Sequence, residues 1–140
     1  MEDSAKPGDH GLIRTDFPGG WKNDKSNAFT GDNLEESQIE MQNYLKTLLN
    51  FRKKSKAIHE GETLHFAPKE GVYLLSRKYE DEIVMYIVNK NDKSMNLDTD
   101  RFIEIDANGK IFTDIHTKKT YKWSGKIQIK NNSSFILTNK

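Results

Sequence analysis

Residues 71–90, GVYLLSRKYEDEIVMYIVNK, decide the class of fold. They contain two short runs rich in aliphatic and aromatic residues, 71–79 and 82–90, and such runs are typical of β-strands. The second run, EIVMYIVNK, is apolar on both of its faces, which predicts a strand in the centre of a sheet. Turn signals stand on either side of the stretch, at Lys69-Glu70-Gly71 and at Asn89 to Lys93.

Short segments with a period of two extend from about Gly61 to the end of the chain. Among the turn signals between them, Asn108-Gly109 is the strongest hairpin signal, because a type I′ turn requires positive φ at both positions. Many short strands without intervening helices predict a mainly β fold, and we expect an antiparallel Greek-key β-sandwich over residues 60–140. The other segments of this pattern are ETLHFAP, SMNLD, RFIEI, KIFTDI, KTYKW, KIQIK and SSFILT.

One long α-helix is predicted before the sandwich, over residues 34–58. Asn33 is the expected N-cap, with Glu36 as its capping-box partner. The basic residues Arg52 to Lys54 suit the negative end of the helix dipole. Apolar residues recur at spacings of three and four, which places them in one stripe that needs a partner to pack on. The stripe consists of Met41, Tyr44, Leu45, Leu48 and Leu49, and it ends at Arg52.

The composition excludes several classes of function. A net charge of +1, from 22 basic and 21 acidic residues, supplies no basic field of the kind that nucleic-acid binding requires. The absence of cysteine excludes disulfides and thiol nucleophiles. The longest apolar run, Ile83 to Val88, is far too short to span a membrane. We therefore expect no nucleic-acid partner and no membrane partner, while the cellular compartment stays open.

The first 33 residues are rich in Gly, Asp, Asn and Lys and have no steady hydrophobic period, which predicts an irregular loop. Within them, residues 9–21 read DHGLIRTDFPGGW and combine charged groups with a Pro-Gly-Gly bend. Such a segment has the character of an active-site rim. It is followed by NAFT at residues 27–30 and by YLKTLLNFRKKSKAIHEGETLHFAP at residues 44–68.

These stretches resemble the end of α-amylase-type enzymes of glycoside hydrolase family 13, especially neopullulanase and cyclomaltodextrinase-like members. In that family an Asp-Phe-Pro-Gly-Gly-Trp-like loop follows the eighth strand of a TIM barrel, and the last barrel helix comes next. The helix ends in a Leu-aromatic-Arg-Lys pattern, which residues 48–53 match. A proline followed by Val-Tyr then opens a C-terminal sandwich, and Pro68, Val72 and Tyr73 match it.

The resemblance implies a division of the chain at residue 59. Residues 1–59 would be a remnant of the (β/α)₈ barrel, made of its last loop, 1–33, and its last helix, 34–58. Residues 60–140 would be the C-terminal β-sandwich. In a barrel of this type the loops after the strands build the catalytic face, which accounts for the character of the first loop.

Enzymes of this family cleave α-glucosidic bonds with a carboxylate nucleophile, a carboxylic acid and a further Asp, by a retaining mechanism. The family's motifs for these groups lie before the eighth strand, and none occurs in this sequence. We therefore expect a non-catalytic C-terminal fragment of an α-glucan-cleaving glycoside hydrolase. Its partners would be the missing catalytic barrel of the same polypeptide and, through that parent enzyme, the α-glucan substrate.

Four residues of the first loop are implied to lie near the substrate in the parent, namely Asp9, Arg14, Asp16 and Trp21. Arg14 and Asp16 suit charged hydrogen bonds to sugar hydroxyls, and the alternative is an ion pair that holds the loop in place. Trp21 either stacks on a sugar ring or wedges the loop against the barrel.

A second hypothesis is a free-standing carbohydrate-binding module. Tyr121 and Trp123 lie on the same face of one predicted strand and would form its sugar platform, although the alternation of this strand also suits core packing. This hypothesis leaves the helix and the first loop unexplained. A third is a small protein-interaction domain, and without a barrel we expect self-association through the helix stripe of Met41, Tyr44, Leu45 and Leu48.

The histidines give no metal signal. His59, His65 and His116 share no metal-ligand spacing with one another. The segments DANGK and NKNDK lack the register of a calcium loop and are predicted to be turns. We expect no metal site and no cofactor in this chain.

Overall fold

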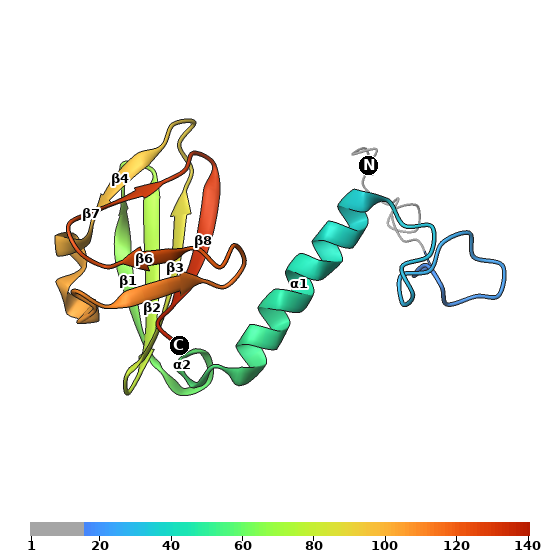
Figure 1. Cartoon of the computed structure of the whole chain (residues 1–140), viewed down its shortest axis with the longest axis horizontal. Helices are drawn as coiled ribbons and strands as arrows, with labels where there is room; N and C mark the ends of the chain where they lie inside the picture. The colour runs from blue at the N-terminus through green and yellow to red at the C-terminus, as the bar shows by residue number, and fades with distance from the viewer. Residues whose placement is uncertain (1–15) are drawn as a thin grey trace, which may run out of the picture. The chain divides into compact units, whose positions relative to one another are not determined.

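The computed structural model describes residues 16–140 (Figure 1). The chain divides into two compact units, one that ends at Asn43 and one that spans Tyr44–Lys140. The described part of the first unit is mostly irregular, as expected. Its turns are held by short side chains: the Asp24 carboxylate accepts hydrogen bonds from the amides of Gly19, at 2.7 Å, and Trp21, at 3.0 Å. Asn27 does the same for Phe29 at 2.9 Å.

The long helix is present as α1, Glu36–Lys54, but its expected N-cap is wrong. Asn33 has a φ of 54°, whereas an N-cap residue takes an extended backbone. The reciprocal hydrogen bonds lie two residues later. The amide of Glu35 donates to the side-chain oxygen of Gln38 at 2.9 Å, and the amide of Gln38 donates to the carbonyl of Glu35 at 3.0 Å.

The helix does not continue to residue 58 as predicted, because Ser55 interrupts it. Ser55 has an extended backbone, with φ −87° and ψ 116°, and its hydroxyl accepts from the amide of Ile58 as the N-cap of a second helix, α2, Lys56–Glu60. The same hydroxyl donates to the carboxyl group of Glu82 at 2.5 Å, in a buried position. A buried serine with two partners therefore sets the direction of the chain between α1 and the sandwich.

Short α2 is fixed to the sandwich by Arg77. Its guanidinium donates to the carbonyls of Ala57, at 2.9 Å, and Gly61, at 2.7 Å, and to the hydroxyl of Thr63, at 2.8 Å. Ala57 is fully buried. Three charge-assisted bonds from one rigid fork place the carboxyl end of α2 at the start of the sheet.

Two antiparallel sheets follow, which confirms the predicted mainly β sandwich. The larger has six strands in the order β1-β2-β3-β8-β5-β6, and the smaller pairs β4 with β7. The strand β8 returns after β7 to lie beside β3. The strands are β1 Glu62–Lys69, β2 Val72–Tyr79, β3 Glu82–Asn89, β4 Met95–Asp98, β5 Ile111–Asp114, β6 Thr120–Lys122, β7 Lys126–Ile129 and β8 Ser133–Thr138.

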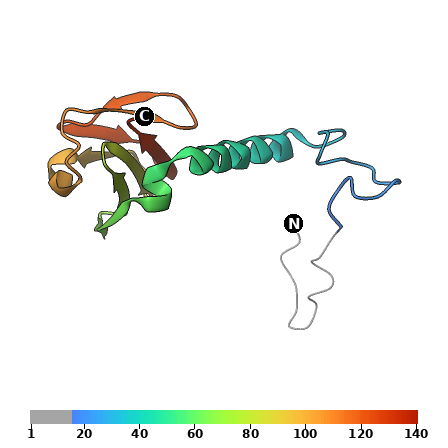
Figure 2. The same cartoon turned by 90° about the horizontal axis from the view of Figure 1, so that it is seen from below.

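The six-stranded sheet curls, so that β5 and β6, together with the β4–β7 pair, lie across the face of β1, β2 and β3 (Figures 1 and 2). Alternate residues of β2 and β3 point into the space between the layers. The strand β3 lies between β2 and β8, which confirms its prediction as a central strand. The core includes Leu74, Ile83, Met85, Ile87, Leu97, Phe102, Phe112, Trp123, Ile129 and Leu137.

Two local predictions are wrong. RFIEI is not a strand but part of a 3₁₀ segment, η1, Thr99–Ile105, because the carboxylate of Asp98 accepts from the amide of Asp100 and starts a helical turn. Asn108-Gly109 is not a type I′ hairpin, since only Gly109 has positive φ. The turn connects η1 to β5. The β1–β2 hairpin has positive φ at both central residues instead, with 50° at Glu70 and 73° at Gly71.

Candidate functional site

The residues predicted near the substrate divide into two pairs. Asp9 and Arg14 lie outside the described residues. Asp16 and Trp21 are exposed in the first unit. The loop that presents Trp21 is fixed from within by Asp24, as described above. Its indole ring is thus displayed on a defined turn rather than packed in a core.

The predicted platform of Tyr121 and Trp123 is not a flat pair of exposed rings. Trp123 is 2% exposed and packs edge-on against Phe112, with ring centroids 5.9 Å apart. Such burial leaves no ring face for a sugar, so Trp123 belongs to the core. Tyr121 is only half-buried and meets Phe135 edge-to-face at 6.1 Å.

Tyr121 lines a groove of about 540 Å³. We call it the β6–β8 groove. A volume of this size lies within the range of small-molecule sites, about 300–1,000 Å³. The groove brings together residues from α1, from the turn after β5, and from β6, β7 and β8. Its lining consists of Tyr44, Asp114, His116, Thr117, Lys119, Tyr121, Gln128, Lys130, Ser133, Ser134 and Phe135.

The turn after β5 shapes one wall of the groove. The buried carboxylate of Asp114 accepts from the amides of His116 and Thr117, both at 2.8 Å. This fixes the His116 ring against the ring of Tyr44, with centroids 3.9 Å apart and planes tilted by 37°. The Nε2 atom of His116 is buried and has no hydrogen-bond partner within residues 16–140.

Charges of both signs surround the phenol of Tyr121. Burial raises the pKa of Tyr121, and the negative charge of Asp114 raises it further. The ammonium of Lys119 lies 5.3 Å from the centroid of the same ring. The phenol is therefore neutral at physiological pH and able to donate or accept a hydrogen bond.

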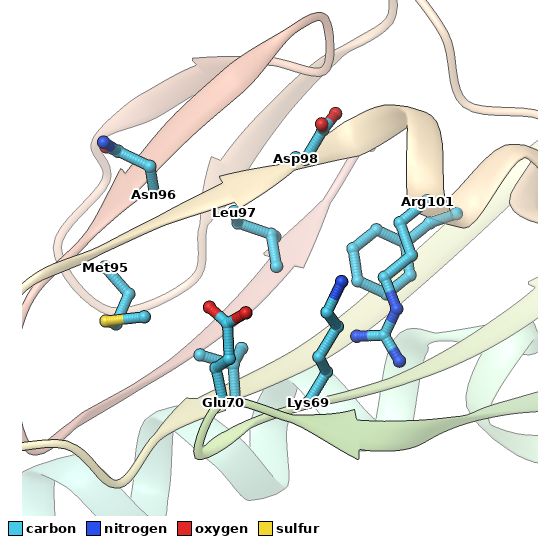
Figure 3. Close-up of a pocket in the computed structure, with 9 residues that line it drawn as sticks. Lys69, Glu70, Met95, Asn96, Leu97, Asp98 and Arg101 are labelled. Carbon is cyan, nitrogen blue, oxygen red and sulfur yellow. The ribbon is translucent and has the colours of Figure 1, made fainter.

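A smaller crevice opens between the β1–β2 turn, β4 and η1, and its volume is about 130 Å³. Figure 3 shows Lys69 and Glu70 rising from the turn beside Leu97, with Arg101 reaching in from η1. The guanidinium of Arg101 donates to the carbonyl of Ala67 and lies 5.2 Å from the ring of Phe102. This crevice is too small for a sugar chain, since small-molecule sites have volumes of about 300–1,000 Å³.

The helix α1 presents its apolar stripe in two parts rather than one. Thr47, Leu48 and Phe51 are half-buried on one side. On the adjoining side Leu45 and Leu49 are each 52% exposed, and α1 has no fully buried residue. We call Met41, Leu45 and Leu49 the open side of α1. A stripe that is covered along only one edge indicates a second packing partner.

Residues 16–140 contain no group of three His, Cys, Asp or Glu side chains placed to hold a metal ion. None of their helices has the length and apolar character needed to cross a membrane.

Sequence reasoning identified Tyr121 but missed the rest of the β6–β8 groove. Tyr44 was predicted to belong to the helix stripe, and neither His116 nor Gln128 was predicted to lie near Tyr121. These residues are far apart in the chain, and only the curl of the sheet brings them together. No local spacing in the sequence signals that arrangement.

The sandwich matches a known family of protein domains. Residues 63–138, more than half of the chain, match the family described as the cyclo-malto-dextrinase C-terminal domain. This agrees with the family resemblance of the sequence and with the boundaries of the strands, since the match begins in β1 and ends with β8.

Solved structures share the fold at low sequence identity. AmyP, crystallised in complex with maltose, is 19% identical with a TM-score of 0.62 over 79% of this chain. An α-amylase from Anoxybacillus is 20% identical, with a TM-score of 0.58 over 76%. The maltogenic amylase from S. marinus is 16% identical, with a TM-score of 0.53 over 79%. The matched parts make up only 22%, 23% and 14% of those three chains.

Proposed function

The chain belongs to the cyclo-malto-dextrinase C-terminal domain family, and we propose that it is the carboxyl-terminal part of a longer α-glucan-cleaving glycoside hydrolase. In this proposal the sandwich is a non-catalytic accessory domain that covers one flank of a catalytic barrel and stabilises it. Support comes from the family match and from relatives that are amylases several times longer than this chain.

We infer the same division as from the sequence. Residues 1–59 would complete the barrel with its last loop and last helix, and residues 60–140 would form the sandwich. The interruption at Ser55 refines this division, because α2 is already attached to β2 through Arg77. The helix α1 would then belong to the barrel, and α2 would belong to the joint.

The open side of α1 is the observation on which this role rests. Leu45 and Leu49 expose about half of their surface, while the neighbouring Leu48 and Phe51 are half-buried. Apolar side chains gain stability when they leave water, at about 25 cal/mol per Å². A barrel body packed on the open side would remove the exposed leucines from water and hold the sandwich beside it.

The chemistry of the reaction would lie in the preceding barrel. A retaining mechanism needs two carboxyl groups about 5–5.5 Å apart, and these would come from earlier strands. The first loop would contribute substrate contacts through Asp9, Arg14, Asp16 and Trp21. The exposed Trp21, presented by the Asp24 turn, is the described residue best placed for such a role.

The size of the native polypeptide tests the proposal first. Intact mass from the source cells should exceed this 16.2 kDa chain by at least a barrel, roughly 250 residues. A native product of 16.2 kDa would contradict the glycosidase proposal.

A second test uses the longer enzyme. There, Leu45→Asp with Leu49→Asp should lower the temperature at which half of the catalytic activity is lost. The matched control is Ile103→Asp, which alters an exposed isoleucine on η1.

A further inference from the structure

We propose that the β6–β8 groove binds α-glucan chains directly, as a secondary site separate from the active site of the parent enzyme. This inference rests on the proposed function for the choice of sugar. The groove itself is defined by residues of the sandwich and by Tyr44 from the middle of α1, all within the second unit.

The lining has the two kinds of group that a neutral sugar requires. Tyr44 and Tyr121 supply aromatic surface with a polar end, which suits the mixed faces of a glucose ring. Gln128, Ser133 and Ser134 supply neutral hydrogen-bonding groups to the same lining. Small-molecule sites commonly combine aromatic walls with a few polar groups in this way.

The charged groups of the lining favour a ligand that accepts hydrogen bonds. They are the ammonium groups of Lys119 and Lys130 and the carboxylate of Asp114. Asp114 is buried and already accepts from the amides of His116 and Thr117, so it is not free to pair with a cation. The two lysines would repel a cation and can donate hydrogen bonds to the hydroxyl oxygens of a sugar.

Tyr44 is the ring best placed to stack on a sugar. One of its faces is supported by His116 at 3.9 Å, and the residue is 39% exposed. Support from His116, whose turn is fixed by Asp114, reduces the ordering that binding would cost. Tyr121 would present its neutral phenol beside it.

The test is calorimetric titration of the full 140-residue chain with maltoheptaose, and with cellohexaose as the comparison sugar. We expect saturable binding of maltoheptaose, weakened about threefold to tenfold by Tyr44→Ala. Gln128→Ala removes a hydrogen-bonding side chain from the lining and should weaken binding by a similar factor. The matched control is Tyr86→Ala, which removes a tyrosine of the same 39% exposure from β3 and should leave binding unchanged.

Absence of maltoheptaose binding, or binding unaffected by both groove variants, would overturn the secondary site and leave the barrel-supporting role intact. Preference for cellohexaose would overturn the choice of α-glucan here. A native polypeptide of only 16.2 kDa would instead contradict the proposal that the chain is part of a longer enzyme. Any maltoheptaose binding measured in the groove would still stand. The two proposals therefore fail by different observations.

Discussion

Ser55 shows how one small side chain determines where a helix ends. Its hydroxyl accepts from the amide of Ile58 at 3.3 Å and donates to Glu82 at 2.5 Å. Both Ser55 and Glu82 are buried, so water cannot replace either partner. The cap of α2 and the pairing of a buried carboxyl group therefore depend on the same oxygen.

Ser55→Ala should lower the free energy of unfolding by about 2–3 kcal/mol, from the lost cap and the unpaired carboxyl group. Urea denaturation followed by tryptophan fluorescence measures it, because Trp123 lies in the core. Ser124→Ala, at an exposed turn serine, is the control and should change stability little. A loss for Ser55→Ala no larger than that of the control would show that the hydroxyl does not hold the joint.

Tyr121 predicts a pH dependence at the alkaline end. Its pKa is raised by burial and by Asp114, so the folded state holds the phenol proton more tightly than the unfolded state does. The resulting stability is present below the ordinary tyrosine value of about 10 and is lost as pH rises through the folded pKa. Wild-type protein should therefore lose stability above about pH 10 more steeply than Tyr121→Phe.

Tyrosinate absorbance during alkaline titration checks this directly. The spectrum of wild type minus Tyr121→Phe should show a phenol that ionises later than an ordinary tyrosine. Tyr86→Phe, at an exposed site on β3, controls for the loss of one absorbing group. A difference spectrum that titrates at or below the ordinary value would contradict the assignment.

At the scale of elements, the strands were predictable because their hydrophobic pattern is local. β1, β2, β3 and β8 all lie where apolar and aromatic runs predicted them. RFIEI is also rich in apolar residues, yet it forms part of η1, because the side chain of Asp98 caps a helical turn there. Phe102 and Ile105 of this segment are buried in the core. The end of α1 was missed for a related reason, since the partner of Ser55 is Glu82, distant in sequence.

The β1–β2 hairpin depends on Gly71 for two separate reasons. Its φ is +73°, which costs about 1–2 kcal/mol for a residue with a Cβ atom. A Cβ at this position would also lie 2.7 Å from the side chain of Asn91, which donates to the carbonyl of Glu70 at 2.7 Å. Gly109 has a similar φ of +78° with nothing within 4 Å of its added Cβ.

Gly71→Ala should therefore destabilise the protein more than Gly109→Ala. Gly109→Ala, the control, loses only the backbone term of about 1–2 kcal/mol, whereas Gly71→Ala must also displace the side chain of Asn91. Chemical denaturation of both variants measures the difference. Equal losses would mean that Asn91 moves aside freely and that only the backbone conformation matters at this turn.

At the scale of the whole molecule, the sequence predicted the layers but not the surfaces that they create. The alternation of KTYKW left both a platform and a core role open for Trp123, and burial at 2% decides for the core. The β6–β8 groove arises where β6, β7 and β8 lie near Tyr44 in the middle of α1. Its position follows from sheet curl and strand order, which a residue pattern along one strand does not contain.

The open side of α1 determines how the isolated chain should behave without its proposed barrel. Leu45 and Leu49 are each 52% exposed, and full burial of a leucine stabilises by about 1.5–3 kcal/mol. Covering the exposed halves of two leucines on each of two chains would contribute about 4 kcal/mol, which only matches the lowest estimates, about 4 kcal/mol, of the cost of the freedom that two chains lose on association. Self-association should therefore be weak and visible only at high concentration.

Sedimentation velocity over a concentration series tests this expectation. The wild-type chain should shift toward a dimer at the highest concentrations, and Leu45→Glu with Leu49→Glu should remain a monomer throughout. Ile103→Glu, which changes an exposed isoleucine away from α1, should associate like the wild type. Association that persists in the double variant would place the contact elsewhere on the sandwich. A strictly monomeric wild-type chain would mean that the open side of α1 is too small to bind a second copy, so that only a larger complementary surface, such as a barrel, could cover it.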